Sequence, residues 1–239
     1  MKVSMQVYVY FMRSFYRQMK NRIVISLVVL ATVVGVQLIN NIWFNQPVIA
    51  MYSGVSFDEA RDGNFAFPVV WLFIQMLPFY MLGNSFGWSI TRLDTTIIGR
   101  LRNISRILLW RVKFAVIATM CACYSVCIFL AVSVVQYGTL VNIYDFGKMI
   151  SMMCLFIFMV VLFSWLEYSI SSAVAFLVIA IFYGLTVYIK TPYYFLSLAM
   201  GLRYDVYYEN QGMSVFLIVL TLTMVAYFYG KWSYRKIEF

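Results

Sequence analysis

The region from Met149 to Ile189 places the strongest limit on the fold of this chain, because it carries a single charged side chain. One straight helix over this region would measure about 60 Å, roughly twice the thickness of the hydrocarbon core of a membrane. The region must therefore fold back on itself. Its polar side chains gather near the middle, at Ser164, Glu167, Ser169, Ser171 and Ser172. The sequence thus predicts two membrane-spanning helices joined by a tight turn at this cluster.

The composition of the whole chain agrees with this reading. Hydrophobic residues make up 64% of the sequence, charged residues make up 11%, and the mean hydropathy is +0.84. Soluble domains typically contain about 25% charged residues. The 239 residues have room for about six spans of about 20 residues each. We therefore expect an all-α, polytopic helical membrane protein with a single transmembrane domain over residues 1–239.

Four further apolar runs complete the predicted set of six spans, at about 23–44, 67–90, 107 or 112 to 137, and 213–229. Pro78 falls in the middle of the second span and is expected to kink it. A short loop is expected over residues 138–148, between the third span and the hairpin. Residues 190–212 are polar and rich in aromatic side chains, and the apolar stretch Leu196–Leu202 within them is too short to span. We expect a re-entrant or interfacial segment there.

Residues 1–22 are predicted to form an amphipathic helix in the membrane interface. Arg13, Arg17 and Lys20 share one helical face, and Phe11 and Phe15 lie opposite. Such a helix directs its basic side chains toward anionic lipid headgroups. It lacks the single short apolar core and small-residue cleavage site of a signal peptide, so we expect it to be retained.

The distribution of charge predicts the orientation. The chain contains 18 Lys and Arg residues. With both termini in the cytoplasm, only four of them fall in outer loops: Arg61, Lys148, Lys190 and Arg203. Basic residues concentrate on the cytoplasmic side of membrane proteins. The net charge of +9 is explained by this topology, and nucleic acid is not an expected partner.

The longest charged interruption of the apolar sequence is residues 92–113. Its apolar side chains recur at helical spacing, at Leu93, Ile97, Leu101, Ile104 and Leu108. Polar and basic residues fall opposite them, at Arg92, Thr95, Gly99, Arg102 and Arg106. We expect an amphipathic helix, a break near Asn103, and a new helix capped by Ser105. A cytoplasmic loop kept basic only by the orientation rule remains an alternative.

Motifs for catalysis are missing. The chain has no histidine, no phosphate-binding GxxxxGK[ST] loop and no pair of acids inside its predicted spans. The four cysteines lie inside apolar runs and favour neither a metal site nor a disulfide framework. We therefore expect no enzyme activity from this chain alone, and no metal or cofactor bound by it. Glu167 is the one candidate intramembrane charge, although water would reach it at the predicted turn.

Polar residues in the first two spans are candidates for a transport pathway or a subunit interface, because lipid-facing polar groups are costly. These residues are Gln37, Asn40, Gln75, Asn84 and Ser85, and Glu167 joins them as a candidate.

Taken together, these features resemble the membrane (permease) subunit of an ABC exporter with the type-2 transporter fold. The resemblance rests on the topology and on residues between spans two and three, namely Asp94, Thr95, Thr96, Leu101, Ile104, Ser105, Arg106 and Lys113. Asn103 stands where the family usually has proline, and Arg92 stands where an acid is common.

The resemblance implies how such a chain works. Two permease subunits, identical or different, pair with separate ATP-binding cassette ATPases, which bind the ATP and Mg²⁺. Residues 92–106 would be the coupling segment that docks on the ATPase, through Arg92, Asp94, Thr95, Ile97, Leu101, Arg102, Ser105 and Arg106. Short re-entrant helices follow span five in this family. We expect export of an apolar or amphipathic cargo (an antimicrobial peptide, a lipid or a hydrophobic drug) across a bacterial cell membrane.

Two other classes of membrane protein agree less well with the sequence. A membrane-embedded enzyme is disfavoured by the missing histidine and paired acids. A secondary carrier or channel without an ATPase partner is the main alternative, but such proteins usually contain internal repeats or several buried ion-binding acids, which this sequence lacks.

Overall fold

The computed structural model describes residues 2–44, 54–83, 106–137, 143–191, 194–203 and 212–234. These residues are all-helical. The long helices are α1 (Lys2–Phe44), α3 (Val69–Leu82), α6 (Arg106–Tyr137), α7 (Ile143–Ser169), α8 (Ser172–Tyr188) and α10 (Gly212–Tyr234). Two short elements accompany them, the helix α2 (Phe57–Asp62) and the 3₁₀ helix η3 (Phe195–Ala199).

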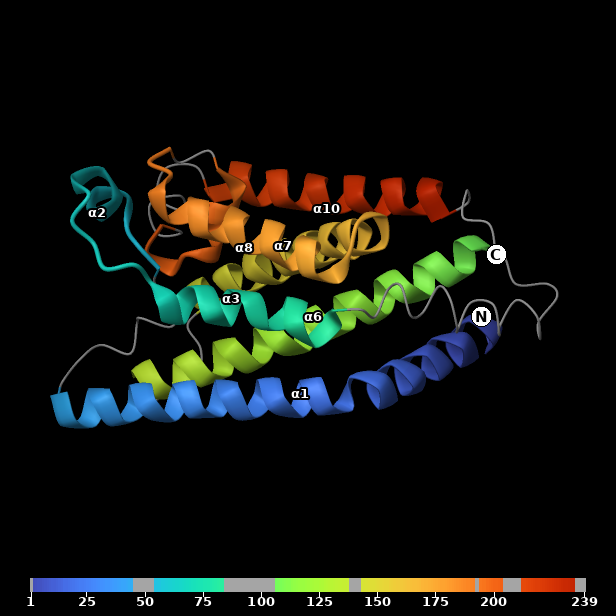
Figure 1. Cartoon of the computed structure of the whole chain (residues 1–239), viewed down its shortest axis with the longest axis horizontal. Helices are drawn as coiled ribbons and strands as arrows, with labels where there is room; N and C mark the ends of the chain where they lie inside the picture. The colour runs from blue at the N-terminus through green and yellow to red at the C-terminus, as the bar shows by residue number, and fades with distance from the viewer. Residues whose placement is uncertain are drawn as a thin grey trace.

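The long helices lie lengthwise beside one another and alternate in direction (Figure 1). Helices α1, α6 and α8 run toward the end that carries α2, and α3, α7 and α10 run away from it. We call the opposite end the basic end, because its exposed side chains include Arg13, Arg17, Lys20, Arg106 and Arg111. The start of α1 and the end of α10 therefore share the basic end of the molecule.

Three helical segments are long and apolar enough to cross a membrane, namely Met5–Ile39, Arg106–Ala131 and Gly147–Ser169. Three shorter apolar helices accompany them among the described residues, Val69–Leu82, Ser172–Tyr188 and Leu217–Ser233. These helices fit a multi-pass membrane protein. The prediction of an all-α fold is thus confirmed, and the apolar helices are compatible with the predicted membrane class. The count of six spans stays a prediction.

Helix α1 joins the predicted interfacial helix to the first span in one continuous helix of 43 residues. Residues 2–34 contain neither proline nor glycine, so nothing in the sequence interrupts the backbone hydrogen bonding. At about 1.5 Å per residue the helix is about 65 Å long, which exceeds the thickness of a membrane. It bends in its N-terminal third, near the basic end (Figure 1).

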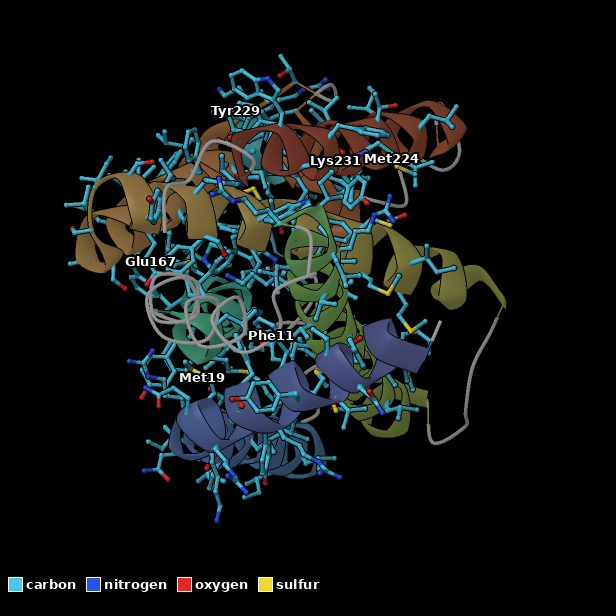
Figure 2. All side chains as sticks on the ribbon, turned by 90° about the vertical axis from the view of Figure 1, so that its right-hand side faces the viewer. Phe11, Met19, Glu167, Met224, Tyr229 and Lys231 are labelled. Atoms are coloured by element: carbon cyan, nitrogen blue, oxygen red, sulfur yellow. The ribbon has the colours of Figure 1, made fainter. Side chains whose placement is uncertain are left out.

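The apolar face of this N-terminal third is covered by protein. Val7, Phe11, Phe15 and Met19 recur every four residues and are all buried (Figure 2 labels Phe11 and Met19). The Tyr8 hydroxyl lies 2.9 Å from Thr119 Oγ1 of α6, and Lys113 Nζ of the same helix lies 5.9 Å from the centre of the Phe11 ring. The two predicted faces are therefore present, and the apolar one packs on α6. The location of the segment in a membrane interface stays a prediction.

The predicted hairpin is confirmed. Helix α7 ends at Ser169 and α8 begins at Ser172. Ser171 caps α8, since its hydroxyl accepts a hydrogen bond of 3.3 Å from the Val174 N–H. The serines that suggested a turn thus include the residue that starts the second helix.

One predicted boundary differs from the structure, and another falls outside the described residues. The loop expected over residues 138–148 is shorter, because α7 already begins at Ile143 and contains Gly147. A glycine weakens a helix by only about 1 kcal/mol, which the packing of a long apolar helix outweighs. Pro78 lies inside α3 as predicted, but α3 is described only to Leu82, so the remainder of that predicted span lies outside the described residues.

Helices α6 and α10 approach closely at a glycine. The Trp110 side chain of α6 is fully buried, and its Nε1–H donates to the Tyr227 carbonyl of α10 at 3.1 Å. A Cβ atom added to Gly230 would lie only 2.1 Å from Cζ2 of Trp110. Trp165 of α7 completes the contact, with its ring centre 5.8 Å from that of Trp110. The absence of a side chain at position 230 lets the indole fit between the helices.

Candidate functional site

Among the described residues, the buried polar side chains include Arg203 at the α2 end, Gln75 in the interior and Glu167 near the basic end. We describe them in this order, together with the predicted site residues that they contain.

The guanidinium group of Arg203 is fully buried and binds backbone carbonyls. Its Nε–H donates to the Val55 carbonyl at 2.7 Å. Its Nη1 donates to the carbonyls of Thr186 at 2.8 Å and Ile189 at 3.0 Å, and its Nη2 donates to that of Val187 at 2.9 Å. One side chain thus holds together the segment before α2, the end of α8 and the segment after η3.

This arrangement follows from the chemistry of helix ends. The last carbonyls of a helix have no partner within the helix and carry a partial negative charge. Arginine supplies five N–H donors in one plane, so it can satisfy several of these carbonyls at once. The Phe57 ring covers the guanidinium carbon at 4.7 Å from the ring centre, a distance typical of cation–π contacts.

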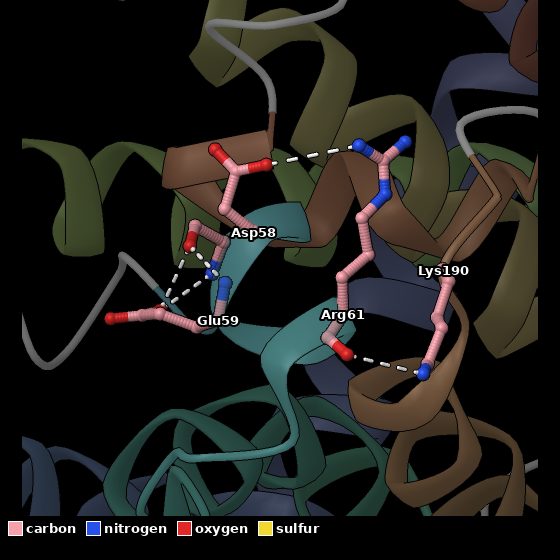
Figure 3. Close-up of polar contacts among 5 residues, drawn as sticks. Asp58, Glu59, Arg61 and Lys190 are labelled. Carbon is pink, nitrogen blue, oxygen red and sulfur yellow. Dashed lines mark hydrogen bonds and ion pairs between the residues drawn. The ribbon is translucent and has the colours of Figure 1, made fainter.

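The conformation of the segment around α2 brings it into contact with this arginine. Gly54 has a φ of +65°, and a Cβ there would lie 2.5 Å from Met200 Cγ, so only glycine fits. Ser56 and Glu59 then form a reciprocal capping box at the start of α2, with bonds of 2.9 and 3.2 Å (Figure 3). At the end of α2, Lys190 Nζ lies 3.4 Å from the Arg61 carbonyl.

The segment η3 corresponds to the predicted short apolar stretch after span five. Leu196, Ser197, Leu198 and Ala199 are all buried, and η3 contacts α7, α8 and α10. Tyr194 precedes it, and partial burial raises the pKa of its phenol above the ordinary value, while a hydrogen bond to Thr186 acts in the opposite direction. The stretch is thus a buried 3₁₀ turn, and its re-entrant nature stays a prediction.

Gln75 lies in the interior of the helix bundle. Its side chain is fully buried, and its Nε2 lies 3.4 Å from the Ala199 carbonyl of η3. Trp71, one turn earlier, donates to the same carbonyl at 2.8 Å. Within the described part of the chain, Gln75 Oε1 and the buried hydroxyl of Tyr183 make no hydrogen bond. Gln75 therefore faces the interior of the helix bundle and η3.

Glu167 corrects a prediction. It lies three residues before the α7–α8 turn, yet its side chain is only 8% exposed (Figure 2). The expectation that water reaches it is therefore wrong, because α7 packs against neighbouring helices up to its last turn. A residue next to a turn in the sequence can still be buried when its side chain points toward the other helices of the bundle.

The other predicted residues are spread out. Arg106 is exposed at the first described position of α6, at the basic end. Gln37 is half-buried near the end of α1, and Asn40 lies in the same helix. The remaining predicted residues lie outside the described part of the chain: Asn84, Ser85, Arg92, Asp94, Thr95, Ile97, Leu101, Arg102 and Ser105.

The hydrogen bonds of Arg203 to backbone carbonyls were not predicted from the sequence. The sequence identified this residue only as one of the few basic residues in the predicted outer loops. No local motif marks it, because its carbonyl partners lie 14 to 148 positions away in the chain.

In comparisons with known proteins, the chain matches no known protein family, no characterised protein and no solved structure.

Proposed function

We propose that this chain is the permease subunit of an ATP-driven exporter with the type-2 transporter fold. It would cross the cell membrane six times with both termini in the cytoplasm, and move an apolar or amphipathic cargo outward. A separate ATPase would supply the energy, and a second permease subunit would complete the pathway.

The observation that carries the proposal is the arrangement at the basic end. Helix α3 runs toward that end and α6 begins there, beside the N-terminal third of α1 (Figure 1). The basic amphipathic sequence of residues 92–106 connects these two helices. A two-faced basic element between spans two and three, on the side of the N-terminus, is what coupling to a cytoplasmic ATPase requires.

The count of six spans is supported by the alternation of helix directions. The described part of α3 rises by about 21 Å and α8 by about 26 Å, somewhat less than the hydrocarbon thickness of about 30 Å. Both helices are nevertheless apolar, and both run alongside the three longer candidate spans. The buried turn η3, held near the end of α8 by Arg203, supports a re-entrant segment on the outer side.

The basic charge of residues 92–106 suggests how docking would work. Arg102 and Arg106 would meet acidic groups of the ATPase, and Leu101 would enter an apolar cleft. Interface anchors of this kind typically contribute about 2 kcal/mol or more, or roughly thirtyfold in affinity.

The test uses the tagged chain expressed together with an ATPase encoded beside it. The triple variant Leu101→Asp, Arg102→Glu, Arg106→Glu should lose most of the copurifying ATPase and of the cargo-dependent ATP hydrolysis. The double variant Arg61→Glu, Lys190→Glu reverses two exposed bases at the opposite end and should retain both. Equal copurification of the triple variant, or no ATPase with the unmutated chain, would contradict the proposal.

A further inference from the structure

An apolar groove of about 490 Å³ lies between α1, α3 and α8. Ile25 and Val29 of α1 form one wall, and Phe176 and Ala180 of α8 form the other. Side chains of α3 lie between these walls, among them Phe73, Met76 and Tyr80. Since Phe73 is 48% exposed, the groove opens sideways to the surroundings of the bundle.

The dimensions of the groove suit one hydrocarbon chain. It follows α3 from Val69 to Tyr80, a rise of about 17 Å. One leaflet of a membrane occupies about half of the hydrocarbon core of about 30 Å. The groove is therefore about as long as the acyl chain of a lipid in a single leaflet.

One end of this groove carries a positive charge. Arg22 lies one turn before Ile25 on α1, and its guanidinium carbon is 5.9 Å from the centre of the Tyr80 ring. Its Nη1 donates to the carbonyl of Gly83, the residue that ends α3. This bond fixes the arginine at the mouth of the groove. A guanidinium has five N–H donors, and the geometry of those that remain suits phosphate oxygens.

The charges near this mouth favour an acidic headgroup. The preceding turns of α1 carry the exposed side chains of Arg13, Arg17 and Lys20. Among the described residues, the exposed acids Asp58, Glu59 and Asp62 lie in α2, at the far end of the molecule. The groove thus combines an apolar floor with a basic mouth, which matches the two parts of an amphiphile.

We propose that this groove binds one acidic glycerophospholipid, with an acyl chain along α3 and its phosphate at Arg22. The lipid is a resident ligand on the side of the bundle. Its binding needs no ATPase and therefore does not depend on the exporter function.

The experiment is native mass spectrometry of the full-length chain in micelles with equal amounts of phosphatidylglycerol and phosphatidylcholine. The unmutated chain should retain one phosphatidylglycerol in preference to phosphatidylcholine, by about fivefold for one basic side chain at the membrane surface. Arg22→Gln should abolish this preference, and Arg22→Lys should keep most of it. Arg111→Gln removes an exposed base of α6 that does not belong to the mouth of the groove, and should leave the preference unchanged.

A second pair of variants tests the groove itself and does not depend on the folding of the Arg22 variants. Ala180→Phe fills the groove and should remove the retained lipid. Ala31→Phe adds the same side chain to an exposed position of α1 outside the groove, and should retain the lipid.

Three outcomes would overturn the proposal. The first is equal retention of both lipids by the unmutated chain. The second is an equal loss of preference in Arg111→Gln and Arg22→Gln, which would indicate diffuse attraction. The third is unchanged lipid retention in Ala180→Phe, and a loss of self-association in this variant would then assign the groove to a second copy of the chain.

Discussion

Arg203 carries a full charge in a place without access to water, and its carbonyl partners account for its tolerance there. Moving an isolated guanidinium out of water is costly, but hydrogen bonds to several carbonyls offset much of this cost. The carbonyls of Val55, Thr186, Val187 and Ile189 depend on it in turn. Removing the arginine would leave the carbonyls of Val55 and Val187 without this buried donor, whereas the Thr186 carbonyl would keep a hydrogen bond from the Ile189 N–H. The loss of a partner by a buried carbonyl is destabilising.

Arg203→Met is expected to destabilise the protein by about 3 kcal/mol, because it keeps an unbranched apolar stem but removes all of the donors. The thermal midpoint of the purified chain in detergent, followed by tryptophan fluorescence, should fall clearly. Arg61→Met removes an arginine whose side chain is 62% exposed at the same end of the molecule, and should leave the midpoint nearly unchanged. Equal midpoints for the two variants would contradict the structural role of Arg203.

Individual elements were predictable where their determinants are local in the sequence. The α7–α8 hairpin was found from its serines because a helix cap acts within three residues. The burial of Glu167 and the contacts of Arg203 were not, since they depend on helices brought together from elsewhere. The packing of Phe11 on α6 was missed for the same reason, since an apolar helix face looks identical in sequence whether lipid or protein covers it.

The contact between α6 and α10 offers a test at this scale. Gly230→Ala is expected to cost about 1–3 kcal/mol, because the new methyl group would overlap the ring of Trp110. Gly184→Ala, in α8, meets no atom within 4 Å and should instead stabilise its helix slightly. The same thermal midpoint measurement distinguishes them, and a Gly230→Ala variant as stable as Gly184→Ala would show that the helices are not so close.

At the scale of the whole molecule, the alternation of helix direction gives the bundle two ends with different charge. The basic end gathers the exposed Arg and Lys side chains of α1 and α6, whereas α2 at the other end carries Asp58, Glu59 and Asp62. In the proposed topology, the orientation rule would place the basic end in the cytoplasm. The all-helical class could be predicted from composition and apolar runs, because it depends on sums over many residues.

Cysteine labelling in intact cells tests this orientation. After removal of the four native cysteines, a cysteine at Asp58 should react with a reagent that cannot cross the membrane. A cysteine at Arg17, which is equally exposed at the basic end, should react only after the cells are opened. Reaction of position 17 from outside, or protection of position 58, would contradict the proposed orientation.

The position of Arg203 in the chain has a consequence for biosynthesis. Its partners at residues 55 and 186–189 leave the ribosome before it does, so the end of α8 stays open until the chain has been made beyond residue 203. We expect closure of the α2 end to be a late event, after the hairpin of α7 and α8 has formed. A chain released early, before residue 203, would contain the helices up to α8 but would leave the carbonyls at the end of α8 without this arginine, and would be a natural substrate for membrane quality-control proteases.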